Sequence, residues 1–335
     1  MATQEEILDY WQQHIEAAQE RIAPYIRETP LEYAPYLSRL TGVEVWLKME
    51  NWQVSGSFKI RGVFNKLLSV PEATRKSALF VAVSTGNHAS AFAYACNLLG
   101  LNGKIFLPTT VASAKLQYIQ SFGIPYELYG RESLETELYA GEYARKHGAV
   151  LVHPYNDPDI VAGQGTIAPE LLRAHSSLDA VFIPVGGGGL ASGIATYLSA
   201  KAPEVARIGC QPKNSPEMHV SIRKGSIITE SITKPTLSDG TAGGIEPGSI
   251  TFELCRDYLH DIVLLSEKEL RQALHWMLAN HQQMIEGAAA NSLAALFQQQ
   301  DQWKGKQVAL VLCGKRLSMD KLKKVVLPSW MSRWI

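Results

Sequence analysis

Short apolar runs rich in β-branched and aromatic residues alternate with longer segments of helical periodicity along most of the chain. The apolar runs predict strands, and the segments that follow predict helices, because their apolar positions recur every three or four residues. Strands are expected at 79–83, 104–108, 125–130, 179–185, 205–212, 261–266 and 307–314. Helices are expected at 89–99, 111–123, 132–148, 190–203 and 267–281, with a last one from about residue 318. Such βα repetition is typical of parallel sheets covered by helices on both faces.

The composition is that of an ordinary globular protein, with 335 residues, 46% of them hydrophobic and 19% charged. The length favours two domains or one large α/β unit. Lys and Arg together number 32, as do Asp and Glu, so the net charge is zero and no nucleic-acid partner is indicated. No apolar run approaches about 18 residues, so no membrane span is expected. Residues 1–22 predict an acidic amphipathic helix and not a signal peptide.

The four cysteines lie far apart and form no CxxC motif, so their spacing does not indicate a zinc site. They are Cys96, Cys210, Cys255 and Cys313. Three of them lie in apolar contexts, which suits reduced thiols in a protein core. A cytoplasmic location is therefore expected.

The stretch "VFIPVGGGGLASGIA", residues 181–195, predicts a buried strand, four glycines and a helix. Successive backbone N–H groups at a helix start suit an anion such as a phosphate, whereas a merely tight turn needs only one or two glycines. The run fits the loose dinucleotide pattern GxGxx[GA], but the next strand ends at Gln211 and supplies no ribose-binding acid. GxxxxGK[ST] does not occur either. A cofactor with a single phosphate is therefore favoured.

A second stretch, "SGSFKIRG" at residues 55–62, places Lys59 between two large apolar side chains. As a strand it would turn Lys59 and Arg61 toward water. Alternatively, Lys59 is desolvated in a pocket, so that its amine forms a Schiff base with a carbonyl. The polar turns that follow predicted strands, where ligands bind in such sheets, lie at 84–88, 186–189, 212–217 and 313–316.

Four blocks together resemble one family of enzymes, namely "SGSFKIRG", "STGNHASAFAYA", "HPYNDPDIVAGQGTIAPELL" and "VGGGGLASGIA". In this order they are similar to the fold-type II pyridoxal-phosphate enzymes, in the serine/threonine dehydratase and serine racemase branch, over roughly residues 20–315. The resemblance implies an α/β fold like that of the tryptophan synthase β chain, with two open twisted parallel-sheet domains and pyridoxal 5′-phosphate between them. The large domain would be 1–51 and 153–335, and the small domain 52–152.

The resemblance also implies β-elimination, in which L-threonine or L-serine is dehydrated and deaminated to a 2-oxo acid and ammonia. The enzyme would be a homodimer that takes a small amino acid, with no nucleic-acid or membrane partner. Since the chain ends soon after the last block, it resembles the short catabolic form. The tail 325–335, with its two tryptophans, would either cover the dimer interface or pack on the chain's own core.

The resemblance assigns roles to individual residues of the site. Lys59 would be the Schiff-base lysine and general base, and Phe58 would back the cofactor ring. Asn87 would bind the 3′ oxygen of the ring, and Cys313 would lie beside its nitrogen as a neutral thiol, which leaves a weaker electron sink and favours elimination. The phosphate would bind to Gly186, Gly187, Gly188 and Gly189. The substrate carboxylate would bind at a helix N-terminus, to Ser84, Thr85, Gly86, Asn87 and His88, with His88 in a supporting role before an acid–base one.

Three departures from the branch leave alternatives open. Lys315 and Arg316 stand where a glycine and an asparagine are usual, and their charge favours an acidic substrate such as 3-hydroxyaspartate. Thr85 stands where dehydratases often carry alanine and racemases serine, so its hydroxyl, a catalytic candidate opposite Lys59, keeps serine racemase as an alternative. The third departure is at the metal loop of the branch, where Gln211 replaces a glutamate, with Ser215 and Glu217 after it. A single carboxylate is a poor Mg²⁺ or Ca²⁺ site, so no metal is expected.

A protein of a different class, a non-catalytic ligand-binding protein on the same fold, is the remaining alternative. Lys59, Asn87 and the glycine run argue against it, since a binding protein needs no Schiff-base lysine.

Overall fold

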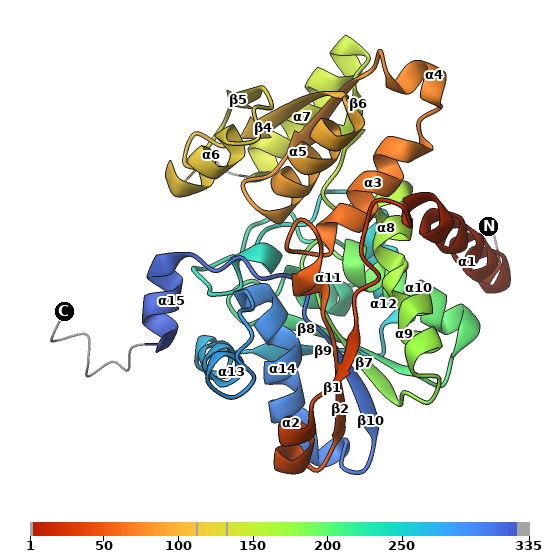
Figure 1. The fold of residues 1–335 in the computed structure, drawn as a ribbon, viewed down its shortest axis with the longest axis vertical. Coiled ribbons are helices and arrows are strands. Elements are labelled where there is room, and N and C mark those ends of the chain that lie inside the picture. The colour runs from red at the N-terminus through yellow and green to blue at the C-terminus, as the bar shows by residue number, and fades with distance from the viewer. Residues whose placement is uncertain (1–2, 112, 132, 327–335) are drawn as a thin grey trace, which may run out of the picture.

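The protein is described by a computed structural model that covers residues 3–111, 113–131 and 133–326. Two sheets lie one above the other in Figure 1, with helices around them. The larger sheet has the strand order β1 (Leu31–Tyr33), β2 (Glu44–Lys48), β10 (Gln307–Val311), β7 (Ala180–Pro184), β8 (Ala206–Pro212) and β9 (Asp261–Leu265). The smaller sheet has the order β5 (Tyr126–Leu128), β4 (Asn102–Leu107), β3 (Leu79–Val83) and β6 (Val150–Val152). The predicted α/β class with two parallel-sheet units is confirmed.

The first helices of the chain are α1 (Gln4–Ile22), α2 (Pro35–Thr41), α3 (Lys59–Ser69), α4 (Glu72–Arg75), α5 (Asn87–Leu99), α6 (Ser113–Gln120) and α7 (Ser133–His147). Those that follow are α8 (Pro158–Gly165), α9 (Ile167–Ala174), α10 (Gly189–Lys201), α11 (Glu217–Lys224), α12 (Ile250–Tyr258), α13 (Glu267–Asn280), α14 (Gly287–Gln299) and α15 (Met319–Val326). Short 3₁₀ turns are η1 (Glu50–Trp52), η2 (Asp239–Thr241) and η3 (Gln300–Gln302).

Every strand predicted from an apolar run is present, and β1, β2 and β6 are additional. One strand departs from the parallel arrangement, because β1 pairs antiparallel with β2 at the edge of the larger sheet. The reason lies in residues 34–43, which join the two strands. A parallel neighbour needs a crossover of about a dozen residues or more, and this connection is shorter.

The smaller sheet is buried on both faces. In β3, Phe80 and Ala82 contact the core that α3 and α5 share, whereas Val81 and Val83 contact a separate core beneath α7. Successive side chains of a strand point to opposite faces, so a sheet covered on both sides needs an apolar residue at every position. This explains why "LFVAV" could be identified as a strand from its composition alone.

Three helices form a closely packed stack between the two sheets. A Cβ atom on Gly163 of α8 would lie 2.6 Å from the Cα of Gly62 in α3. A Cβ atom on Gly193 of α10 would lie 2.6 Å from the backbone nitrogen of Gly165, at the end of α8. The backbones therefore touch where only glycine fits. Since Lys59 begins α3 and the glycine run precedes α10, this stack fixes the two candidate elements relative to each other.

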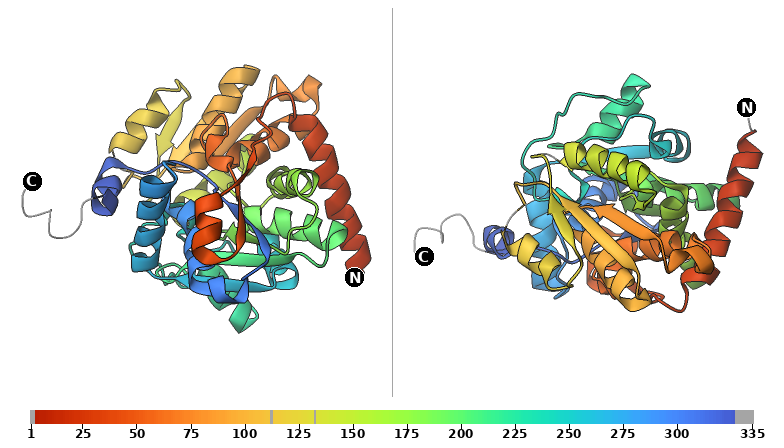
Figure 2. Two further views of the ribbon diagram at one scale, coloured as in Figure 1. Left: turned by 60° about the horizontal axis from the view of Figure 1, so that its bottom comes forward. Right: turned by 90° about the horizontal axis from the view of Figure 1, so that it is seen from above.

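The predicted amphipathic helix at the N-terminus is α1. A capping box starts it, in which the Glu6 backbone N–H donates to the Thr3 hydroxyl (3.2 Å) and the Thr3 N–H donates to the Glu6 carboxylate (2.7 Å). Its apolar face is buried at Trp11, Ile15, Ala18 and Ile22. Figure 2 shows α1 and α15 at opposite sides of the molecule.

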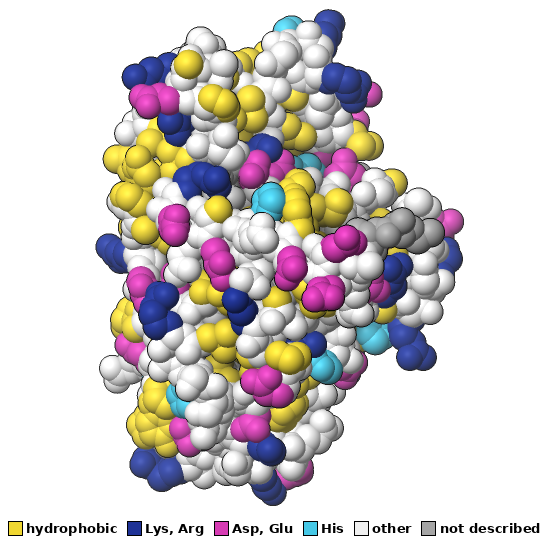
Figure 3. Space-filling view, turned by 90° about the vertical axis from the view of Figure 1, so that its right-hand side faces the viewer, with side chains coloured by type: hydrophobic (Ala, Val, Ile, Leu, Met, Phe, Trp, Pro, Cys, Tyr) yellow, Lys and Arg dark blue, Asp and Glu magenta, His cyan; other side chains and the backbone are white. Residues whose placement is uncertain are grey.

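The surface fits the balanced composition. On the face shown in Figure 3, acidic and basic side chains are interspersed, with small apolar patches between them. Within the described residues no helix has both the length and the apolar character needed to cross a bilayer. All four cysteines are buried and unpaired, whereas the sequence predicted this for three of them. Residues 31–48 and 180–311 supply the larger sheet and 79–152 the smaller one, but the domain boundaries stay a prediction. Most of the tail with its two tryptophans, residues 327–335, lies outside the described residues.

Candidate active site

Lys59 lies at the start of a helix, so the strand interpretation of "SGSFKIRG" is wrong. The loop before α3 is held to the turn after β10, because the Phe58 N–H donates to the Cys313 carbonyl (3.0 Å). The Lys59 amine donates to the carbonyl of Pro154 (2.7 Å) and lies 5.2 Å from the centre of the Phe58 ring. Burial lowers the pKa of Lys59 to about 8, against the opposing influence of Glu137. About a tenth of the amine is therefore neutral, and nucleophilic, at pH 7, far more than for an ordinary lysine.

The glycine run lies between β7 and α10, and its neighbours leave no space for side chains. A Cβ atom on Gly187 would lie 2.5 Å from the Tyr155 ring, and one on Gly186 would lie 2.9 Å from the Cα of Thr241. Gly188 has φ +90°, a left-handed conformation that favours glycine. No side chain caps the N-terminus of α10. Its first backbone N–H groups are thus available to an anion, which fits a phosphate.

Residues 153–156 connect the lysine to the glycine run. Pro154 accepts the hydrogen bond from Lys59, and the ring of Tyr155, the next residue, faces Gly187. The Tyr155 hydroxyl accepts a hydrogen bond from the Glu246 N–H (2.9 Å), which holds the ring in place. The lysine and the predicted phosphate site therefore belong to one site. No pattern in the sequence singled out Tyr155.

Asn87 is the first residue of α5 and has one polar atom free. Its side-chain N–H groups donate to both carboxylate oxygens of Glu286 (2.9 and 2.8 Å), whereas its buried amide oxygen has no partner. An unpaired buried oxygen is costly, so a ligand group is expected there. The 3′ oxygen of a pyridoxal ring fits this position. The N-terminus of α5 also lacks a side-chain cap, which suits the substrate carboxylate predicted at residues 84–88.

His88 is buried one residue further along α5. One ring nitrogen hydrogen-bonds to the carbonyl of Val152 (2.7 Å), and burial lowers the pKa of His88 to about 3. The imidazole is therefore neutral, and this nitrogen is a donor to the end of β6. Such a residue supports the segment that carries Pro154, in keeping with the predicted supporting role. Ser84 lies in the same turn, where its hydroxyl accepts a hydrogen bond from the Gly86 N–H (3.1 Å).

Cys313 lies two residues after the end of β10, beside a carboxyl group that the sequence analysis did not identify. Its buried thiol contacts Glu286 (3.8 Å between sulfur and oxygen), and burial raises the pKa of Cys313 well above its ordinary value. The thiol is thus neutral. Burial also raises the pKa of Glu286 to about 7, and the Arg316 N–H donates to its carboxylate (3.2 Å). One signal was available, since Glu286 is the only acidic residue between Glu269 and Asp301.

The two atypical cations of the "CGKR" turn make contacts away from Lys59. The Lys315 side chain lies over Gly56, where an added Cβ atom would be 3.0 Å from its Cε. The Arg316 guanidinium stacks on the Tyr118 ring, 3.9 Å from its centre, and donates to the Tyr118 hydroxyl. Tyr118 belongs to α6, beside the smaller sheet. Arg316 therefore connects the turn after β10 with the other sheet unit.

Carboxyl groups, and not these cations, are the charged side chains that act on the Lys59 amine. Glu137 of α7 carries a pKa that burial raises to about 7, and the charges of Lys59 and Glu246 both act on it. Glu246 pairs with His153 (3.1 Å) and accepts a hydrogen bond from Asn156 (2.8 Å). The electrostatic surroundings of the lysine are therefore acidic.

The loop after β8, which the family resemblance raised as a possible metal loop, is occupied by internal hydrogen bonds. The Glu217 carboxylate accepts hydrogen bonds from the hydroxyls of Ser215 (2.5 Å) and Thr233. The Gln211 side chain accepts one from the His219 N–H (3.1 Å). Across the described ranges no group of three His, Cys, Asp or Glu residues could hold a metal ion. The absence of a metal stays a prediction.

This arrangement around Lys59 and the glycine run fits the pyridoxal-phosphate enzymes of fold type II. The chain belongs to the family described as "Pyridoxal-phosphate dependent enzyme", whose match spans residues 22–314. Its cofactor is pyridoxal 5′-phosphate, as predicted.

Individual relatives cover nearly the whole chain. An L-threonine ammonia-lyase of Thermotoga maritima is 38% identical over 313 residues, which are 93% of this chain and 77% of that protein. The structure of threonine deaminase isoform 2 from Solanum lycopersicum has a TM-score of 0.87 and 30% identity, over 95% of this chain and 87% of the other. Serine racemase from Dictyostelium discoideum has a TM-score of 0.83 and 29% identity, over 92% and 99%. The predicted dehydratase and racemase branch is confirmed.

Proposed function

We propose that this enzyme catalyses β-elimination of L-threonine and L-serine, releasing a 2-oxo acid and ammonia. The observation that carries the proposal is the Lys59 amine, whose pKa is lowered to about 8 beside a neutral thiol at Cys313. The similarity to proteins named threonine ammonia-lyase and threonine deaminase supports the same reaction.

Each group of the site has a task in this reaction. Pyridoxal phosphate, when bound, draws electrons from the α carbon of an attached amino acid and so makes its α proton acidic. Lys59, as a neutral amine, removes that proton at Nζ. The N-terminus of α5 orients the substrate carboxylate, and the glycine run at α10 holds the phosphate. Cys313 keeps its proton, since its pKa is raised, and does not charge the ring nitrogen.

The charge of the site supports a neutral substrate over 3-hydroxyaspartate. Lys315 and Arg316, which suggested an acidic substrate, contact Gly56 and Tyr118. The carboxyl groups of Glu137 and Glu286 act electrostatically on Lys59, and each of them raises its pKa by attracting its positive charge. A second carboxylate on the substrate would be repelled by these acidic groups.

Serine racemase remains the second candidate, supported by Thr85 and by the similarity to a solved serine racemase. A racemase needs a proton donor on each face of the α carbon, and the Thr85 hydroxyl would supply the second one. Its methyl group restricts the rotamer, however, and a short-lived carbanion loses its β-hydroxyl first. Elimination is therefore expected to dominate.

Product analysis distinguishes these reactions. The holoenzyme is incubated separately with L-serine, L-threonine, 3-hydroxyaspartate and their D-isomers, and 2-oxo acids and both serine enantiomers are measured. Elimination predicts pyruvate from L-serine well in excess of D-serine, and Thr85→Ala should remove any D-serine while leaving pyruvate formation largely intact. D-serine formed faster than pyruvate would make the enzyme a racemase. Threonine inert beside a strong preference for 3-hydroxyaspartate would refute the neutral-substrate argument. A visible cofactor band without turnover of any substrate would favour the ligand-binding alternative.

We also propose that the enzyme is a cytoplasmic homodimer. The four unpaired, buried thiols suit a reducing compartment, and the dimer rests on the family resemblance. Light scattering during size-exclusion chromatography should give twice the mass of 36.9 kDa. A single-chain mass across the working concentration range would contradict the dimer.

A further inference from the structure

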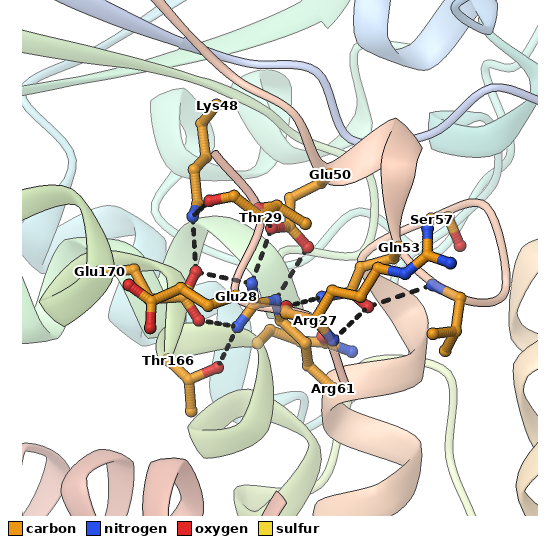
Figure 4. Close-up of polar contacts among 12 residues, drawn as sticks. Arg27, Glu28, Thr29, Lys48, Glu50, Gln53, Ser57, Arg61, Thr166 and Glu170 are labelled. Atoms are coloured by element: carbon orange, nitrogen blue, oxygen red, sulfur yellow. Dashed lines mark hydrogen bonds and ion pairs between the residues drawn. The ribbon is translucent and has the colours of Figure 1, made fainter. Parts of the chain in front are cut away.

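Four ionised side chains are buried together beneath the helix that begins with Lys59 (Figure 4). We call Lys48, Glu50, Arg61 and Glu170 the charge quartet. Their exposed fractions are 1%, 0%, 0% and 4%. Lys48 ends β2, Glu50 begins η1, Arg61 lies in the first turn of α3, and Glu170 belongs to α9. The quartet therefore joins residues 48–61 to α9, more than 100 positions further along the chain, and its two positive and two negative charges balance.

Arg61 is the centre of the quartet, because all five of its N–H donors are used. It binds Glu50 through two nitrogens, each at 2.8 Å. It binds Glu170 through two nitrogens at 2.7 and 2.8 Å, and donates to the Thr166 hydroxyl at 3.0 Å. Two bidentate contacts fix the plane of the Arg61 guanidinium. A lysine ammonium, which is a point charge without a fork, could not be held in one orientation as firmly.

Lys48 completes the quartet. Its amine donates to Glu170 (2.5 Å) and to the backbone carbonyl of Thr29 (2.6 Å), and the Thr29 hydroxyl donates to Glu50. Glu50 and Glu170 therefore each accept hydrogen bonds from two different residues of this cluster and its surroundings. Burying four charges is costly and often contributes less to stability than apolar packing would, so a role in fixing geometry is a reasonable hypothesis for such a cluster.

The geometry of α3 relates the quartet to the site. Lys59 and Arg61 are two residues apart in a helix, and at about 3.6 residues per turn their side chains point about 200° apart. Arg61 is thus anchored on one side of the helix, while Lys59 reaches Pro154 on the other. No side chain caps the N-terminus of α3, so Arg61 provides the polar anchor of its first turn. The adjacent Gly62 packs on α8 and donates one backbone hydrogen bond to the Gln164 side chain (3.2 Å), whereas Arg61 makes five hydrogen bonds from one rigid guanidinium.

We infer that Arg61 is a positioning residue, which through the charge quartet fixes the rotation of α3 and thereby holds the Lys59 amine in the site. The inference rests on the role proposed above for Lys59. A positioning role differs from a purely structural role in one respect. It requires that the surroundings of Lys59 change when the charge quartet is broken.

Those surroundings offer a direct readout. The groups that face Lys59 are Glu137 of α7, Glu286 before α14, Cys313 after β10 and His88 of α5. Burial among them lowers the pKa of Lys59 to about 8. If the start of α3 rotates, Lys59 gains contact with water and its pKa rises toward the ordinary value of a lysine.

The test uses full-length Arg61→Lys, which keeps the charge and loses the fork, and Glu170→Gln, which keeps the shape and loses a charge. Lys66→Met is the matched control, because Lys66 also lies on α3 and forms ion pairs with Asp157 (2.7 Å) and Asp159 (3.1 Å). For each holoenzyme, kcat and KM for L-threonine are measured with saturating cofactor, together with the urea midpoint. In the cofactor-free chains, the pKa of Lys59 is obtained from competitive acylation across pH and peptide mass spectrometry.

Arg61→Lys and Glu170→Gln should each lower kcat by about 10- to 100-fold with a smaller change in KM, as expected for a displacement of about 1 Å. Both should raise the pKa of Lys59 by about one unit or more, whereas Lys66→Met should leave kcat and this pKa unchanged. Variants that lose urea resistance but keep the pKa of Lys59 and kcat would overturn the inference. Absence of wild-type threonine turnover would instead refute the proposed function, since the acylation profile of Lys59 is measured without substrate.

Discussion

Replacing Glu286 by glutamine should change how the stability of the cofactor-free protein depends on pH. The carboxyl group is buried, and its partners are the Asn87 side-chain amide, the Arg316 N–H and the Cys313 thiol. Glutamine has nearly the same shape and keeps one carbonyl oxygen to accept a hydrogen bond from Asn87. The substitution therefore removes mainly the ability to ionise.

The magnitude follows from the pKa. Burial raises the pKa of Glu286 from 4.5 to about 7. At about 1.4 kcal/mol per pKa unit, ionisation of Glu286 costs the folded chain about 3 kcal/mol relative to the unfolded chain. Between pH 4.5 and 7 the folded chain binds more protons than the unfolded one, so the stability of the wild type falls as the pH rises through this window. Glu286→Gln lacks this loss, and its stability relative to the wild type should rise by about 3 kcal/mol over the same window.

Urea unfolding of both proteins, followed by circular dichroism at several pH values from 4.5 to 8, measures this difference. Glu72→Gln is the control, since the Glu72 side chain is 72% exposed and pairs with exposed Lys76. A stability difference between Glu286→Gln and the wild type that stays constant with pH would refute the reasoning. So would a difference that shrinks as the pH rises.

Two further substitutions test the cofactor cradle and the contact between the sheet units. Gly187→Ala should raise the Kd for pyridoxal phosphate about tenfold to a hundredfold in an absorbance titration, because its Cβ atom would enter the tyrosine ring facing the glycine run, at a cost of about 1–3 kcal/mol. Gly244→Ala, whose Cβ atom would meet nothing within 4 Å, is the control, and equal Kd values would contradict the cradle. Arg316→Ala should raise KM for L-threonine about two- to fivefold with kcat kept, since it removes a cation–π contact of about 0.5–1 kcal/mol, whereas Tyr118→Phe keeps the ring and should change KM less. Unchanged kinetics in Arg316→Ala would show that this contact has no part in substrate binding.

The sequence was most informative where the signal is local. The strand at 79–83 and the glycine run could be predicted because each is a continuous string with one physical explanation, burial on both faces or an anion at a helix start. Lys59 could be singled out from its neighbours, although the helix that it begins could not. The short strands β1 and β6 were not predicted, whereas β5, which is equally short, was identified because predicted helices flank it on both sides.

Contacts between distant residues could not be predicted in the same way. Asn87 and Glu286 are 199 positions apart, and Arg61 and Glu170 are 109 apart. No periodicity in the sequence links such pairs, because their approach is decided by the packing of whole helices. The charge of Arg316 shows the same limit, since its residue type suggested a substrate contact and the fold directs it to an aromatic ring on the other sheet unit.

The most direct test of the central claim, that Lys59 is the base of an elimination reaction, is ammonia release from L-threonine by Lys59→Ala. The holoenzyme and the variant are compared at equal concentration with saturating pyridoxal phosphate, after circular dichroism has shown that the variant is folded. The account predicts that the variant releases no ammonia above the uncatalysed background, because the amine held at Pro154 is removed. Near-normal ammonia release by Lys59→Ala would contradict it.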